Sequence, residues 1–268
     1  MPFSELALLR AFPFRATAPL LVDVGAHQGG FSAAFARRGW RVLAFEPERE
    51  NRAAWQRALA AFPNATCLPL AVSDVDGERL PFYVSAEHYG IHALRPFHPS
   101  HRPAYEVETV RLATALRDHA APPVTLLKLD VEGADLLALR GFDFATQRPE
   151  LVMAEYMDER SLPTYGYTHH AMAELLAAHG YTIYLSMWAP ITSYARAGEA
   201  GEPHSWLGMR RYPLPHASAW GNLIAVPAGR EPALEGALRR CLLRTRLVDA
   251  ARRLPGASRA AQLLRGRR

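Results

Sequence analysis

The sequence predicts an α/β fold in which helices cover both faces of a mostly parallel, seven-stranded sheet with an antiparallel edge strand. Three observations lead to this fold class. Short apolar runs alternate with segments of helical composition from residue 20 to residue 226. A glycine-rich turn from Asp23 to Gly30 joins the first apolar run to the first helical segment. Acidic residues follow several apolar runs, where the carboxyl ends of parallel strands would meet.

Each element is predicted from its local pattern. Strands are expected where a short apolar run stands between turn residues, and helices where apolar residues recur every three or four positions. The expected strands are 20–24, 41–45, 66–72, 124–129, 151–154, 181–187 and 222–226, and the expected helices are 31–38, 49–61, 136–139 and 171–179. A long stretch rich in proline, glycine and aromatic residues separates the last two strands, which favours an antiparallel edge.

Residues 76–122 are too long for a simple crossover between the third and fourth strands, so we expect an insertion there. Residues 79–84 and 106–112 would add strands of their own. Long loops on a compact scaffold usually shape a binding site. We predict an N-terminal extension at 1–17, a main domain at 18–228 and a basic amphipathic helical tail at 229–268.

The composition is that of an ordinary globular protein. Hydrophobic residues make up 49% of the chain and charged residues 21%, which allows a sizeable core. Cys67 and Cys241 have no metal-binding spacing and suit a reducing compartment. Residues 1–18 lack the continuous apolar stretch of a signal peptide, and no run of about 18 apolar residues occurs. We therefore expect a cytoplasmic chain without a transmembrane span.

The positive charge is concentrated at the end of the chain. Residues 230–268 contain eleven arginines and three acidic residues, a net charge of +8, so the rest of the chain carries −3. The body therefore has no bias towards nucleic acid, and no nucleic-acid partner is expected. We expect the tail to pack on its own domain or across a dimer, with an anionic membrane surface as the alternative.

The turn from Asp23 to Gly30 has the setting of a nucleotide-binding loop, because it follows a strand and opens a helix. A dinucleotide fingerprint would have glycine at position 27, where this chain has His27. A side chain there crowds the backbone that a pyrophosphate must approach, which disfavours NAD and FAD. No Lys-Ser or Lys-Thr pair follows, so a P-loop is excluded.

Three acids at neighbouring strand ends favour a cationic nucleoside ligand such as S-adenosylmethionine. Asp23 can meet the cationic head of that ligand, directly or through water. Glu46, which stands 21 residues after Gly25, can accept hydrogen bonds from both ribose hydroxyls. Asp74 can accept from the adenine amino group. The alternative is that these acids only cap turns and helices.

The motifs resemble those of the FkbM-type methyltransferases. The resemblance spans about residues 20–156 and is most specific at Leu127–Asp135, with further matches at Val22–Gly29, Phe45–Pro47 and Ala71–Asp74. It implies a Rossmann-like class I enzyme that uses S-adenosylmethionine, in a family where many members O-methylate sugars or secondary metabolites. The family usually has Asn at the position of His27 and Glu at that of Asp135. The cofactor-binding residues that we predict are Asp23, Gly25, His27, Gly29, Phe31, Glu46, Pro47, Ser73, Asp74 and Asp130.

The end of the fourth predicted strand carries the residues that we expect to do chemistry. Methyl transfer to a hydroxyl needs a base or a metal, because the pKa of the acceptor lies far above 7. Asp130 is the first candidate for a base or a metal ligand, and Glu155, after the fifth strand, is the second. Lys128, the one lysine among 31 basic residues, would neutralise these acids, and Glu132 would accept backbone N–H groups. The alternative is a buried ion-pair network without a catalytic role.

Four histidines of the insertion fall between residues 88 and 101. His88 and His92 have the spacing of a helical metal-binding pair, but Gly90 argues against a stable helix, and no cysteine completes a zinc site. We therefore expect loop histidines without a metal. His92 is included among the predicted catalytic residues, as a base or an acceptor contact, because histidine titrates near neutrality. The other two are His98 and His101.

Two other functions stay open on the sequence alone. A nicotinamide-dependent oxidoreductase would share the fold, although His27 argues against it. A non-catalytic binding module would keep the S-adenosylmethionine site and lose the chemistry. The acceptor would be a small molecule or a glycan that the sequence does not identify, because acceptor loops vary freely on this scaffold. The need for a metal and self-association are likewise left open.

Overall fold

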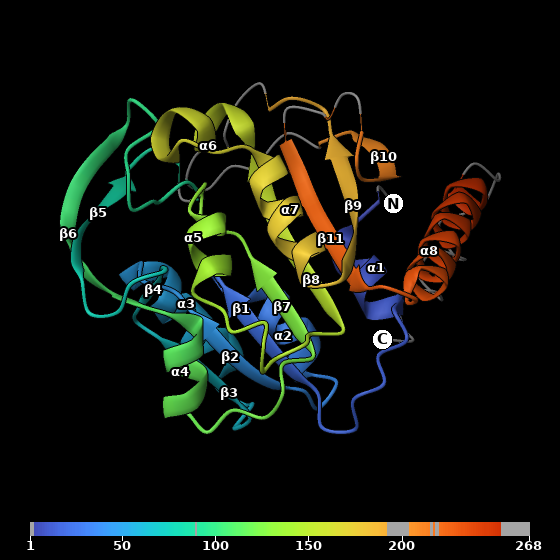
Figure 1. Ribbon diagram of the computed structural model, residues 1–268, viewed down its shortest axis with the longest axis horizontal. Coiled ribbons are helices and arrows are strands. Elements are labelled where there is room, and N and C mark those ends of the chain that lie inside the picture. The colour runs from blue at the N-terminus through green and yellow to red at the C-terminus, as the bar shows by residue number, and fades with distance from the viewer. Residues whose placement is uncertain (1–2, 89, 192–203, 215–216, 218–219, 253–268) are drawn as a thin grey trace. The chain divides into compact units, whose positions relative to one another are not determined.

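The computed structural model of the chain describes residues 3–88, 90–191, 204–214, 217 and 220–252, the last seven of these by their backbone and their membership in a helix (Figure 1). The chain divides into two compact units. Residues 14–228 form one, and residues 1–13 together with 229–268 form the other. The end of the predicted tail, 253–268, lies outside the described residues. All of the predicted site residues belong to the first unit.

An eight-stranded sheet stands at the centre of the first unit, in the order β10-β9-β11-β8-β7-β1-β2-β3. Its strands from β3 to β8 in this order are parallel, so their carboxyl ends share one edge of the sheet. β11 runs antiparallel to both of its neighbours. The strands are β1 (Leu20–Val24), β2 (Arg41–Phe45), β3 (Ala65–Leu68), β7 (Leu126–Leu129), β8 (Leu151–Met157), β9 (Tyr181–Trp188), β10 (Trp206–Arg211) and β11 (Trp220–Pro227).

The predicted fold class is confirmed, and the end of the sheet beyond β8 differs in detail from the prediction. β10 is an additional strand, antiparallel to β9, in a stretch expected to be loop. The antiparallel strand β11 lies inside the sheet, between β8 and β9, instead of at its edge. Nearly every residue of β9 and most of β11 are buried, so neither strand suits an exposed edge. β10 forms the edge of the sheet instead, and its residues are partly or fully exposed.

Helices cover both faces of the sheet, as predicted. α2 and α3 pack beside β1, β2 and β3, whereas α5 and α7 pack beside β8, β9 and β11. Figure 1 shows α5 and α7 in front of the sheet and α2 behind it. Side chains such as Val22, Leu127 and Leu129 are fully buried, and each contributes about 1.5–3 kcal/mol to stability. These helices are α2 (Gly30–Ala36), α3 (Arg49–Leu59), α5 (Asp135–Arg140) and α7 (His169–Ala178).

The predicted strand 66–72 is broken at Pro69, which was a wrong prediction. Proline has no N–H to donate and interrupts the ladder. β3 therefore ends at Leu68, and β4 (Ala71–Val72) joins a separate three-stranded sheet in the order β4-β6-β5. The other two strands, β5 (Arg79–Ser85) and β6 (His101–Val110), pair antiparallel and form most of the insertion. Ser73 and Asp74 consequently follow β4 and not the strand beside β2.

Two helices of this unit were not predicted. α4 (Leu112–Asp118) follows β6 directly, where the pattern suggested the end of a strand. α6 (Asp158–Tyr165) follows β8 directly and contains Pro163, a residue that argues against a helix. β8 also continues three residues beyond the predicted end at Ala154. Both changes matter for the site, because they bring Arg160 to the end of β8.

The second unit pairs α1 (Glu5–Ala11) with α8 (Glu231–Arg252). Arg230 donates to the carbonyl of Pro13 at 2.7 Å, and Arg240 donates to the carbonyl of Ala11 at 2.9 Å.

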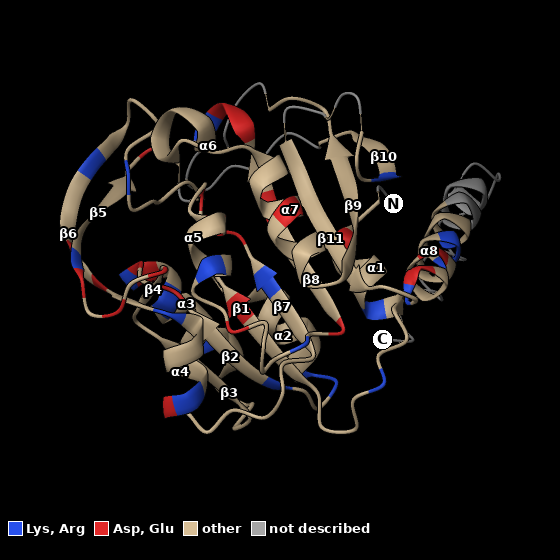
Figure 2. Ribbon diagram, in the orientation of Figure 1, with Lys and Arg blue, Asp and Glu red and all other residues tan. Residues whose placement is uncertain are grey.

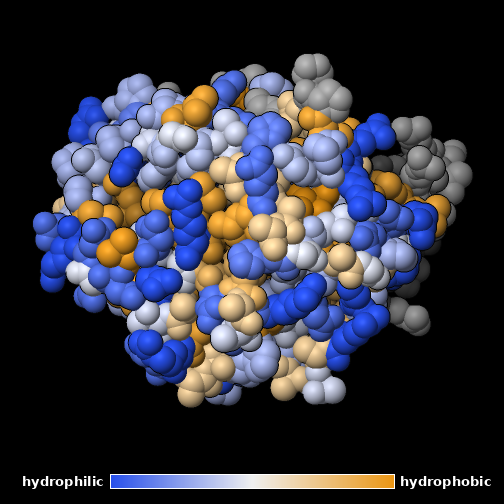
Figure 3. Space-filling model, viewed as in Figure 1, coloured by the Kyte–Doolittle hydropathy of each residue, from blue (hydrophilic) through white to orange (hydrophobic). Residues whose placement is uncertain are grey.

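No helix among the described residues is long and apolar enough to cross a membrane. Hydrophilic residues dominate the face shown in Figure 3, with hydrophobic residues visible between them.

Candidate functional site

The turn after β1 relies on backbone conformations that glycine adopts easily. Gly25 has a φ of 72°, and a Cβ there would lie 1.8 Å from the carbonyl oxygen of Asp130. Gly29 has a φ of 85°, and a Cβ there would meet Trp55 and Leu59 of α3 at under 3 Å. His27 also has a positive φ, 48°, in the region that is unfavourable for bulky residues. The turn is therefore packed tightly between the end of β7 and α3.

Glu46, at the end of β2, ties that turn to the neighbouring strand. Its carboxylate accepts the backbone N–H of His27 at 2.7 Å and that of Glu48 at 2.8 Å, one on each oxygen. The side chain is buried, and burial raises the pKa of Glu46 from 4.5 to about 7. Each carboxylate oxygen has two lone pairs, so both oxygens can accept one further hydrogen bond. This is the geometry needed to receive two adjacent hydroxyls.

Asp23 and Lys128 form a buried pair beneath the turn. Lys128 Nζ lies 3.3 Å from Asp23 Oδ1 and donates to the carbonyls of Gly25 at 2.7 Å and Val24 at 3.3 Å. Burial lowers the pKa of Lys128, but the carboxylates of Asp130 and Asp23 outweigh that effect and raise it overall. Figure 2 shows basic and acidic segments side by side where β7 runs along β1.

The same buried pair extends towards α2 and α3. Ser32 donates its hydroxyl to Asp23 Oδ2 at 2.6 Å, and Trp55 Nε1 donates to the Ser32 hydroxyl at 3.0 Å. Asp23 has no exposed area. Its carboxylate therefore supports the turn from below through Lys128 and Ser32, and the direct contact with a ligand that the sequence suggested is not available to it in this conformation.

Acidic side chains gather at the ends of β7 and β8. Asp130, Glu132 and Glu155 each offer a carboxylate oxygen, and these oxygens lie within 4.8 Å of one another. Asp130 is the most accessible of them, with 43% of its side chain exposed against 15% for Glu132 and Glu155. Among the described residues this is also the group with the geometry to hold a metal ion. We call these three residues the acidic cluster.

Arg160 of α6 completes this arrangement, and the sequence reasoning missed it. Its Nη1 donates to Glu132 Oε2 and, at 3.2 Å, to Glu155 Oε2. Burial nevertheless raises the pKa of Glu132 to about 7, although the Arg160 guanidinium opposes this. Burial, followed by the charge of Asp130, raises the pKa of Glu155 well above its ordinary value. The acidic cluster thus has two mostly buried carboxyls, which pair with Arg160, and one more accessible carboxylate.

Glu132 was expected to accept the backbone N–H groups of its loop, and it does not do so. Asp135 does so instead, from Val131 at 3.4 Å and from Gly133 at 3.3 Å. Glu132 has a positive φ of 57°, which turns its side chain towards Arg160. Burial and the charge of Asp130 raise the pKa of Asp135 to about 7.

His92 lies on the insertion, half-buried, and its ring orientation disfavours the predicted role as a base. Its Nδ1 accepts the backbone N–H of Ser85 at 3.2 Å. Burial lowers the pKa of His92, so the ring is neutral near pH 7 and carries its proton on Nε2. In this conformation His92 therefore offers the Nε2–H donor and has no free acceptor nitrogen for the role of a base. The ring of His98 contacts those of His88 and His101.

The remaining predicted cofactor contacts lie on α2, after β2 and after β4. Phe31 stands on α2 with its ring 5.3 Å from that of Phe35. Pro47 accepts from Arg52 through its carbonyl at 3.0 Å. Ser73 is buried, and its hydroxyl donates to Asp74 Oδ1 at 3.3 Å.

Comparison with known proteins gives one family match and several structural likenesses. A family model described as a methyltransferase FkbM domain matches residues 23–183, which is more than half of the chain and includes both the turn and the acidic cluster. No curated protein sequence matches the chain.

Solved structures resemble the chain at low sequence identity. The precorrin-6Y C5,15-methyltransferase of Geobacter metallireducens is 13% identical, with 83% of this chain and 87% of that chain covered and a TM-score of 0.41. The magnesium protoporphyrin IX methyltransferase of Synechocystis, solved with bound SAM, is 13% identical, with 79% and 71% covered and a TM-score of 0.40. A TehB-like SAM-dependent methyltransferase of Corynebacterium glutamicum is 12% identical, with 83% and 86% covered and a TM-score of 0.42.

Proposed function

The chain belongs to the FkbM-domain family of methyltransferases, and from this premise we propose that it methylates a hydroxyl of a sugar, glycan or secondary metabolite with S-adenosylmethionine. The observation that carries this proposal is the pairing of two features at one sheet edge. Glu46 is tied to the turn after β1 with acceptor capacity left on both oxygens. The acidic cluster stands at the ends of β7 and β8.

The turn and two acids that follow strands offer groups that suit this cofactor. Glu46, after β2, would accept the two ribose hydroxyls, and Asp74, after β4, would accept from the adenine amino group. The backbone from Gly25 to Gly29 would line the amino-acid portion, with Lys128 and Asp23 holding that backbone in place. When bound, S-adenosylmethionine supplies an electrophilic methyl group on a sulfonium.

The acidic cluster would prepare the acceptor. Asp130, which has the most accessible carboxylate of the cluster, would take the hydroxyl proton of the acceptor as its oxygen is methylated. Glu155 is the second candidate for this proton. Arg160 and Lys128 limit the repulsion among the carboxylates by pairing with Glu132, Glu155 and Asp130.

Direct detection of methyl transfer tests this proposal. The chain would be incubated with S-adenosylmethionine and a panel of glycosides and hydroxylated polyketides, and products would be identified by mass. We expect a product heavier by one methylene group, with the methyl group on oxygen. Transfer only to carbon or nitrogen acceptors in a matched panel would overturn the O-methylation part of the proposal and leave the methyltransferase assignment standing.

Cofactor affinity should depend on pH through Glu46. The carboxylate form accepts the ribose hydroxyls, and the pKa of Glu46 in the free protein is about 7. Below pH 7 binding must release a proton, so affinity should fall by about tenfold per pH unit and level off above pH 7. Calorimetric titration from pH 5.5 to 8.5 measures this. Glu46→Gln should bind weakly with a flat profile between those limits; a variant profile that parallels the wild type would assign the pH dependence to another group.

A divalent metal is the alternative use of the acidic cluster. Asp130, Glu132 and Glu155 offer the carboxylate oxygens that Mg²⁺ or Ca²⁺ prefers, and a metal held there would lower the pKa of the acceptor hydroxyl. Arg160 already donates to two of the three carboxylates, which favours the metal-free form of the mechanism. We expect turnover to be unchanged by EDTA. Loss of turnover with recovery on adding Mg²⁺ would instead assign the cluster to a metal.

The oxidoreductase reading is disfavoured by His27, whose side chain stands at a positive φ in the turn that a pyrophosphate would have to approach. The non-catalytic alternative predicts that Asp130→Asn and Glu155→Gln leave turnover of every candidate acceptor untouched while S-adenosylmethionine still binds. We also propose a reducing, cytoplasmic setting, which agrees with two free cysteines, Cys67 and Cys241.

A further inference from the structure

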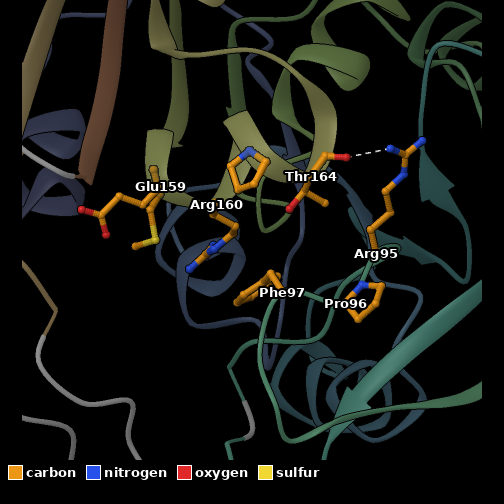
Figure 4. Close-up of a pocket in the computed structure, with 8 residues that line it drawn as sticks. Arg95, Pro96, Phe97, Glu159, Arg160 and Thr164 are labelled. Atoms are coloured by element: carbon orange, nitrogen blue, oxygen red, sulfur yellow. Dashed lines mark hydrogen bonds between the residues drawn. The ribbon is translucent and has the colours of Figure 1, made fainter.

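A pocket of about 580 Å³ opens between the insertion and α6. The insertion contributes Arg95, Pro96 and Phe97, and the end of β8 with α6 contributes Met157, Glu159, Arg160, Pro163 and Thr164 (Figure 4). Phe97 and the two prolines give it apolar walls. The pocket lies next to the acidic cluster, because Arg160 both lines the pocket and bonds to Glu132 and Glu155.

The two arginines of this pocket differ in how their charges are used. Arg160 is buried, its guanidinium is paired with two carboxylates, and it also lies over the ring of Phe97, 4.3 Å from the ring centre. Its charge is therefore balanced within the protein, and it belongs to the wall between the pocket and the cluster.

Arg95 is held in place by neutral groups. Its Nη1 donates to the carbonyl of Thr164 at 2.7 Å, and its guanidinium stacks on the ring of Tyr165 at 4.7 Å. No ion pair joins Arg95 to a carboxylate in the part of the chain that the structure describes, and in Figure 4 the carboxylate of Glu159 lies at the opposite side of the pocket. A guanidinium has five N–H donors, so most of those of Arg95 remain available to a ligand.

We propose that this pocket binds the methyl acceptor and that Arg95 recognises an anionic group on it, a phosphate or a carboxylate. The inference rests on the proposed function in one respect, that the ligand of this pocket is the molecule to be methylated. A planar guanidinium fixed by a carbonyl and an aromatic ring suits bidentate recognition of either group. The ring or chain of the acceptor would pack on Phe97 and the prolines, which directs its hydroxyl towards Asp130 and Glu155.

Three small probes that share one ring test the recognition of charge. Phenyl phosphate, benzoate and benzyl alcohol would be titrated into the full chain at pH 7.5, with binding followed by saturation-transfer NMR. We expect phenyl phosphate or benzoate to bind at least about tenfold more tightly than benzyl alcohol, because a charge-assisted hydrogen bond contributes about that much. The anion that binds more tightly identifies the group that Arg95 recognises.

Two variants assign the preference to Arg95. Arg95→Gln should abolish the preference for the anions and leave the weak binding of benzyl alcohol unchanged. Arg79→Gln is the matched control, because Arg79 is an exposed arginine of the same insertion that pairs with Glu106 outside the pocket; it should keep the preference. Equal binding of all three probes, or a preference that survives Arg95→Gln, would overturn the proposal.

Titration of S-adenosylmethionine into the same samples keeps this inference separate from the proposed function. Arg95→Gln should bind the cofactor as the wild type does. If the wild type binds the anionic probes but not the cofactor, the proposed function fails and the anion site stands. If it binds the cofactor without preferring the anions, the inference about the acceptor fails and the proposed function stands.

Discussion

Replacing Asp130 with Asn should lower kcat by about 10²–10⁴-fold, the usual contribution of a positioned base. The amide keeps the shape of the side chain but cannot take the hydroxyl proton. Lys128 also pairs with Asp130, but it keeps its contacts with Asp23 and with the carbonyls of Val24 and Gly25 in this variant, so the fold and the cofactor affinity should be retained. Initial rates with saturating cofactor measure this effect, with calorimetry and thermal unfolding on the same samples.

The matched control is Asp118→Asn, because Asp118 is an exposed carboxylate at the end of α4 that pairs with its neighbour Arg117. It should leave kcat and cofactor affinity unchanged. Glu155→Gln should also lower kcat if Glu155 shares the proton, and by less than Asp130→Asn. If both cluster variants turn over at the wild-type rate while cofactor still binds, the acidic cluster is an ion-pair network and not the catalytic base.

Replacing Lys128 with Met should lower the free energy of unfolding by about 3–5 kcal/mol, the cost of leaving one member of a buried ion pair without its partner. Asp23 has no exposed area and would retain only the hydroxyl of Ser32. The carbonyl of Gly25 would lose the Lys128 donor as well, whereas that of Val24 would keep the backbone N–H of Asp130. Urea unfolding gives the change in free energy, and cofactor affinity should fall with it because the turn is no longer held.

Two companion variants separate charge from packing. The double variant Asp23→Asn with Lys128→Met removes both charges and should recover a large part of the lost stability. Arg79→Met removes one member of an exposed pair, whose side chains are 70% and 61% exposed, and should cost no more than about 1 kcal/mol. A Lys128→Met variant as stable as Arg79→Met would contradict the buried-pair account.

The sequence predicted which side chains of the candidate site come together, because parallel strands bring their carboxyl ends to one edge of the sheet. Asp23, Glu46 and Asp130 each follow an apolar run, and that pattern was enough to place them at neighbouring strand ends. The single lysine inside an apolar strand was likewise a usable signal, since a buried ammonium requires partners. What each of these side chains does in catalysis or cofactor binding stays a prediction.

Other features could not be predicted from local patterns. Arg160 lies on a helix that contains Pro163, so the helix itself was missed, and an arginine in an arginine-rich chain carries no signal of its own. Because the chain breaks at Pro69, Asp74 follows a strand of the smaller sheet. The orientation of the His92 ring depends on the backbone of Ser85, which only tertiary structure brings into contact with it.

The most direct test of the central claim is calorimetric titration of the wild-type chain with S-adenosylmethionine and, in parallel, with NAD. We predict one S-adenosylmethionine bound per chain with a Kd of roughly 1 μM to 1 mM, the range in which enzymes commonly hold their substrates. We predict no binding of NAD, because His27 occupies the position through which its pyrophosphate would approach the turn. Tight binding of NAD without binding of S-adenosylmethionine would contradict the account.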